Sequence, residues 1–172
     1  MHSIHAMMWR GVMVVAGVCA LAGCSDAEVC DGDCPRVGGI FQIEATSPAQ
    51  GCEFTPWLIG PTLEVRQEPG ASSVLAELID PVNQIPVQLA GDVLRPEDPG
   101  VGVFQMEGQT NRQTTDDSKA ISTFQLLLRG SVTQNETPPR LSATLTTTEI
   151  PPSGSGGCQQ VLHVIGRQVD GS

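Results

Sequence analysis

The sequence predicts an all-β domain whose eight antiparallel strands close into an up-and-down barrel. Eight apolar or alternating segments follow one another between residues 39 and 169, and Pro, Gly, Asn or Asp separates each from the next. No segment keeps a helical spacing of apolar residues over two capped turns. An open sheet of eight strands would leave two exposed edges, which closure into a barrel removes. A two-sheet β-sandwich is the alternative.

The first four predicted strands end at turn signals, and the first three of them are short. The earliest alternates only partly and stops at Ser47-Pro48, whereas the second alternates cleanly and stops at Pro69-Gly70. A short helix over 72–79 is a weaker reading of the third segment, because prolines flank it. The fourth places four apolar side chains on one face: Ile85, Val87, Leu89 and Val93. The expected strands are 40–45, 62–67, 74–79 and 85–94.

The last four predicted strands are all longer than the first three. The sixth is the clearest, with four apolar side chains on one face: Phe124, Leu126, Leu128 and Val132. The seventh is rich in threonine, which suits a pleated surface. Polar residues 111–119 and the Gly/Ser run 153–157 are predicted loops. The expected strands are 101–109, 121–132, 141–150 and 159–169.

The cysteines support closure of the barrel. Cys52 follows the first predicted strand and Cys158 precedes the eighth, so a closed meander brings both to one rim, where we predict a disulfide. A sandwich could also bring them together. Cys30 and Cys34 are then left to pair with each other. A zinc site is disfavoured, because the other two cysteines are far apart in the sequence and provide no second close pair.

The first 23 residues have the features of an export signal. Arg10 supplies a positive charge, and 11–23 is an apolar or small-residue run. The run is too short for a membrane-spanning helix, which needs about 20 residues. Export implies an oxidising compartment and agrees with paired cysteines.

The run closes on Leu21-Ala22-Gly23-Cys24, which resembles the lipobox of bacterial lipoprotein precursors. In that family the signal is cut before the cysteine, whose thiol takes a diacylglycerol and whose amino group is often acylated, as with palmitate. The resemblance implies a signal peptide at 1–23. The acidic, Gly-containing composition of 24–38 predicts a tether, and the length of the rest predicts one domain at 39–172. The resemblance also implies that lipid on Cys24 holds the protein in the envelope of a gram-negative bacterium. Ser25 favours the outer over the inner membrane.

The predicted architecture is similar to that of lipocalins, several of which are bacterial lipoproteins. The resemblance lies in the number of strands predicted between residues 39 and 169. Gly39-Ile40-Phe41 has Phe where lipocalins commonly have the Trp of a Gly-x-Trp motif. The likeness implies a fold that can hold a small apolar ligand.

The connection between the first two predicted strands does not have the polar composition of a solvated loop. Residues 54–61 are mostly apolar and include Phe54 and Trp57, which we name as candidate ligand-binding residues. In a lipocalin-like barrel the first connection forms a lid over the open mouth. The alternative is a plug that closes the barrel end, which we favour because side chains can fill an eight-stranded barrel.

We expect no enzymatic activity, no metal and no cofactor. His163 is the only histidine after the signal, and no Gly-x-Ser-x-Gly motif precedes it. We interpret it as a core or rim side chain, and Asp116-Asp117 as solvated. The net charge of −10 disfavours nucleic-acid binding.

Two functions therefore stay open. One is a non-catalytic structural or interaction domain of the envelope, with another envelope protein as partner. The other is a carrier of a small apolar ligand. In both, lipid on Cys24 would attach the protein to the membrane.

Overall fold

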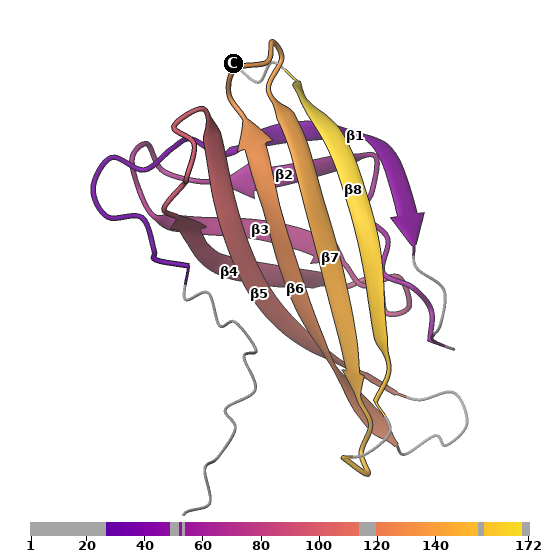
Figure 1. The fold of residues 1–172 in the computed structure, drawn as a ribbon. Helices are drawn as coiled ribbons and strands as arrows, with labels where there is room; N and C mark the ends of the chain where they lie inside the picture. Colours follow the sequence, from indigo (N-terminus) through magenta and orange to yellow (C-terminus); the bar gives the residue numbers. More distant parts are fainter. Residues whose placement is uncertain (1–26, 49–51, 53, 114–119, 155–156, 170–172) are drawn as a thin grey trace, which may run out of the picture.

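The computed structural model describes residues 27–48, 52, 54–113, 120–154 and 157–169, and there it is all β (Figure 1). Eight antiparallel strands form a closed barrel in sequence order, with the first strand paired to the last. The up-and-down barrel is confirmed and the sandwich alternative is wrong. None of the described residues forms a helix that could cross a bilayer. The strands are β1 (Gly39–Pro48), β2 (Thr62–Arg66), β3 (Ser73–Ile79), β4 (Pro86–Leu94), β5 (Val101–Gln113), β6 (Ile121–Thr133), β7 (Arg140–Ile150) and β8 (Gln159–Val169).

Two strand boundaries differ from the expectation in ways that shape the molecule. β4 begins at Pro86, and Ile85 is exposed in the turn before it, so the prediction that Ile85 lies on the buried face is wrong. β5 continues to Gln113 through residues predicted as a loop. The cause is its pairing with β6, which runs without interruption as far as Gln113 opposite Ile121.

The extra length of β5 lies beyond its contact with β4. The β4–β5 register ends where Ala90 faces Glu107, whereas β5 and β6 stay paired to their far ends. The long strands β5, β6 and β7 therefore extend past the shorter β2, β3 and β4 at one end of the barrel (Figure 1). That end also receives the β1–β2 connection and the β3–β4 turn, and we call it the plug end.

The barrel interior is filled by side chains from all eight strands. Leucine and valine dominate, with Phe41, Phe104 and Met106 as the largest strand residues that are fully buried. The alternation predicted for β6 holds, since Phe124, Leu126, Leu128 and Val132 are all buried. The core is one continuous cluster, as expected for an eight-stranded barrel whose lumen is packed rather than open.

The N-terminal segment, residues 27–38, packs on the end opposite the plug end. Val29 forms a bridge with Leu94 of β4, and Val37 is completely buried. The side chain of Gln67 accepts hydrogen bonds from the Val37 and Gly38 N–H groups, at 2.7 and 3.1 Å. The described part of the predicted acidic tether thus belongs to the folded domain, because its backbone and apolar side chains find partners there.

Both predicted disulfides are present. Cys30 and Cys34 are bonded within the N-terminal segment, with Cα atoms 5.7 Å apart. Cys52 and Cys158 are bonded across the first and last connections, with Cα atoms 5.8 Å apart and a sequence separation of 106. The second bond lies at the plug end, where it ties the start of the β1–β2 connection to the start of β8.

Candidate functional site

The candidate site is the plug end, where the β1–β2 connection enters the barrel. Trp57 is only 1% exposed and belongs to the continuous core, together with Ile59. We call residues 54–61 the plug segment. A buried Trp at this position closes the lumen, as the plug interpretation predicts. The disulfide at Cys52 fixes the chain just before the plug segment begins.

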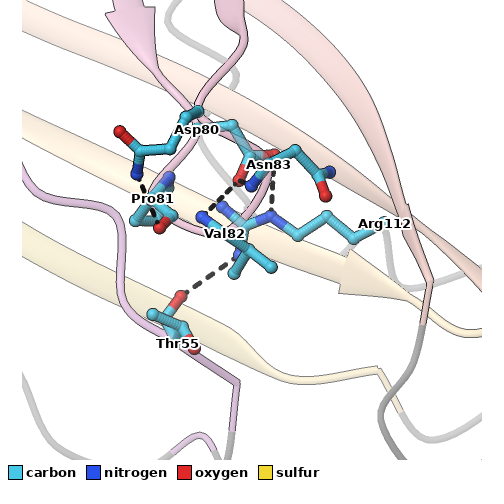
Figure 2. A network of polar contacts seen from close by, with 7 residues as sticks. Thr55, Asp80, Pro81, Val82, Asn83 and Arg112 are labelled. Atoms are coloured by element: carbon cyan, nitrogen blue, oxygen red, sulfur yellow. Dashed lines mark hydrogen bonds and ion pairs between the residues drawn. The ribbon is translucent and has the colours of Figure 1, made fainter.

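Arg112 belongs to the barrel wall and contacts the plug segment from there. It projects inward from the end of β5 and is 4% exposed. Its guanidinium carbon lies 4.4 Å from the ring centre of Trp57 and 4.7 Å from that of Phe124. Cation–π contacts of this kind contribute about 2 kcal/mol when they are desolvated. Arg112 also donates a hydrogen bond to the Thr55 carbonyl at 3.2 Å (Figure 2).

Asp80 compensates the charge of Arg112. The Arg112 Nε atom donates to Asp80 Oδ2 at 2.9 Å, and both side chains are almost completely excluded from solvent. The other carboxylate oxygen, Oδ1, accepts hydrogen bonds from the backbone N–H groups of Val82 and Asn83 (Figure 2). The pair thereby joins three elements: the β3–β4 turn, β5 and the plug segment. Burial of two charges is tolerable because each has several polar partners.

The pKa of Asp80 lies below its ordinary value of 3.8. Burial raises it, but the hydrogen bond from Arg112 and the backbone N–H donors of Val82 and Asn83 lower it by more in sum. The carboxylate is therefore charged at neutral pH, and Arg112 keeps its counter-ion.

Three polar atoms around Arg112 are buried without a hydrogen-bond partner among the described residues: Trp57 Nε1, Arg112 Nη2 and Ser122 Oγ. Ser122 lies directly opposite Arg112 in the β5–β6 register, so two of the three come from facing positions. Buried groups of this kind normally find a partner. The described residues therefore leave the hydrogen-bonding capacity of these three atoms unused.

The two residues named as ligand candidates lie together here. Phe54 is half-buried and meets Phe124 edge to face, with ring centres 5.2 Å apart. The sequence interpretation missed Arg112 and Asp80. Arg112 sits in a polar run typical of loops, and Asp80 precedes a proline as turn residues do. Only the pairing of β5 with β6 makes Arg112 an inward-facing residue.

The other predicted residues lie elsewhere. His163 is on β8 but exposed on the outer face, where Nδ1 is 3.4 Å from Thr144 Oγ1, so the core or rim interpretation is wrong. The inward positions of β8 are the alternate ones, Leu162 and Val164. Cys24 and the pair Asp116-Asp117 lie outside the described residues. Within the described ranges, no three His, Cys, Asp or Glu side chains group as metal ligands.

Three hollows lined by described residues open on the outside of the barrel. Two, of about 440 and 480 Å³, lie on the outer face of β4 to β8. The third, of about 210 Å³, lies between β1 and the plug segment beside Ile59. Comparisons with protein-family models, with curated proteins and with solved structures find no match to this chain.

Proposed function

We propose that this protein is a lipid-anchored envelope protein whose barrel is a solid, non-catalytic structural and interaction domain. The observation that carries the proposal is the burial of Trp57 in the barrel core, where the Arg112–Asp80 pair holds it. A carrier needs an opening to its lumen and room inside. Here a disulfide, an ion pair and an aromatic side chain support closure at the same end.

The anchor is proposed from the lipobox-like run ending at Cys24, and the position of Ala27 supports a close attachment. The described chain begins at Ala27, beside the Glu28–Arg95 ion pair at the end opposite the plug. The three residue steps from Cys24 to Ala27 can span at most about 10 Å. Lipid on Cys24 would therefore hold this end of the barrel against the membrane, the outer membrane by the Ser25 rule. The plug end would point away from it.

Exposed apolar side chains at the plug end support an interaction role. Six of the nine large hydrophobic residues exposed in the described chain lie there, in the plug segment, the β3–β4 hairpin and the ends of β6 and β7. Clusters of this kind on soluble domains mark contact surfaces, whereas scattered single residues do not. They are Leu58, Ile79, Val82, Ile85, Ile121 and Ile150.

Native mass spectrometry of the protein extracted from its own envelope tests the proposal. We expect the mass of a chain that starts at an acylated Cys24, with no small molecule retained. The matched variant Cys24→Ser should keep its signal peptide and carry no lipid. A Cys24→Ser protein that is processed and membrane-bound like the wild type contradicts the anchor. A stoichiometric apolar molecule on the wild-type protein contradicts the solid domain.

The second candidate, a carrier of a small apolar ligand, is favoured by one observation. The three unpartnered buried atoms around Arg112 are suited to the polar head of an amphiphile whose tail displaces core side chains. Such a guest would require the plug segment to move, because Trp57 occupies the end of the lumen.

A further inference from the structure

The outer face of the barrel carries a trough that lies outside the packed lumen. The hollows of about 440 and 480 Å³ share Glu107 in their walls, so they meet at this residue. One continues across β6 and β7 to Gln159 at the start of β8, and the other continues over β4 to Ala27 and Val29 of the N-terminal segment. Five neighbouring strands at about 4.8 Å spacing give a length of about 19 Å.

Two glycines let β4 and β5 lie close together beneath this part of the wall. A Cβ on Gly91 of β4 would lie 1.9 Å from the Gln105 carbonyl oxygen of β5. A Cβ on Gly108 would lie 2.5 Å from the Leu89 side chain. Both strands thus approach more closely than side chains allow, at the point where β5 leaves β4. Both glycines line the trough.

The floor of the trough is a row of amides and hydroxyls. Gln109 faces Gln125, Gln125 faces Thr148, and Thr148 faces Gln159 in the registers of β5 to β8. Gln159 donates to Thr148 at 3.3 Å. The carboxamides of Gln109 and Gln125 bond to no other described residue, so each offers a donor and an acceptor to a ligand.

The neighbouring row adds an apolar patch and an acceptor. Glu107 faces Leu127, which faces Thr146. Glu107 accepts a hydrogen bond from Gln105 at 3.0 Å, and Gln105 in turn accepts one from Arg129 at 2.6 Å. The one cation in the walls is thereby engaged by its neighbours, while Asp92 adds a second carboxylate. The trough therefore suits uncharged ligands better than anionic ones.

We propose that this trough binds a chain of N-acetylated amino sugars. Carboxamides complement acetamido groups in both donor and acceptor, and threonine and Glu107 suit ring hydroxyls. Leu127 and the threonine methyl groups provide contact for the acetyl methyl. A peptide strand fits less well, because β6 and β7 in the trough are hydrogen-bonded to neighbours on both sides and offer no main-chain edge there. The proposal does not depend on the anchor or on the plug.

Calorimetric titration of the detergent-solubilised mature protein with chitotetraose, cellotetraose and tetralysine tests the proposal. We expect chitotetraose to bind at least about tenfold more tightly than cellotetraose, which has hydroxyls in place of acetamido groups, and tetralysine not to bind. Gln125→Ala and Thr148→Ala should each weaken chitotetraose binding about fivefold, which is the loss of affinity expected when one net hydrogen bond is removed.

Gln88→Ala is the matched control, because Gln88 is an exposed glutamine on β4 outside both hollows. The affinity of this variant for chitotetraose should equal that of the wild type. Unchanged urea midpoints for all three variants show that the fold persists. The proposal is overturned by absence of chitotetraose binding at millimolar concentration or by equal affinity for cellotetraose. Insensitivity to both trough variants, or preferential binding of tetralysine, overturns it as well.

Discussion

At the residue scale, Arg112 is the side chain on which the plug end depends most. It contacts two aromatic rings, the Asp80 carboxylate and the Thr55 carbonyl, which belong to three separate parts of the chain: the plug segment, β6 and the β3–β4 turn. No single contact is strong after desolvation is counted, but removing the guanidinium leaves Asp80 buried without its counter-ion.

Arg112→Ala should therefore destabilise the protein by about 3–5 kcal/mol, the usual cost of breaking a buried ion pair from one side. Asp80→Asn combined with Arg112→Gln should cost less than Arg112→Ala alone, since no uncompensated charge remains. Urea unfolding measures both. Arg66→Ala on the exposed face of β2 is the control, with a change below about 0.5 kcal/mol. An Arg112→Ala protein as stable as this control would contradict the assigned role.

Asp80 also makes stability depend on pH. Its pKa is lower in the folded than in the unfolded protein, so its contribution is complete above the unfolded value and declines as pH falls through the folded one. We expect the free energy of unfolding to begin to fall below about pH 5 and to continue falling at more acidic pH. Asp80→Asn should flatten this part of the profile, and an unchanged slope in the variant would argue against the lowered pKa.

At the scale of elements, alternation and turn residues were enough to predict all eight strands and their order, because each strand has one face toward the core. They did not predict where strands end. Residues such as Asn111 and Arg112 are polar and look like a loop, yet pairing with β6 makes them strand. The N-terminal segment was missed for a similar reason, since its burial depends on Gln67 and Leu94, which are distant in sequence.

The two disulfides connect elements over very different spans. Cys52–Cys158 closes a loop of 106 residues, worth about 4–5 kcal/mol in the chain-entropy model, whereas Cys30–Cys34 closes a tiny loop. We expect the double variant Cys52→Ala/Cys158→Ala to unfold at much lower urea concentration than Cys30→Ala/Cys34→Ala. Equal losses in the two variants would show that the long-range bond does not stabilise the barrel as described.

At the scale of the whole molecule, the barrel is closed at both ends by different means. The N-terminal segment covers one end and the plug segment the other, while the interior is a continuous apolar core. The two contact surfaces that we propose then lie outside the lumen, at the apolar plug end and along the outer trough. With lipid on Cys24, the first of these surfaces would point away from the membrane.

The emission of Trp57 tests the closed barrel most directly, since Trp9 is removed with the predicted signal and Trp57 is then the only tryptophan. We expect a blue-shifted spectrum that does not change when fatty acids or similar amphiphiles are added. Trp57→Ala should cost about 3–5 kcal/mol of stability, as other large core truncations do. A saturable change in emission, together with a Trp57→Ala protein that melts at nearly the same temperature, would contradict the plug and make the barrel a carrier.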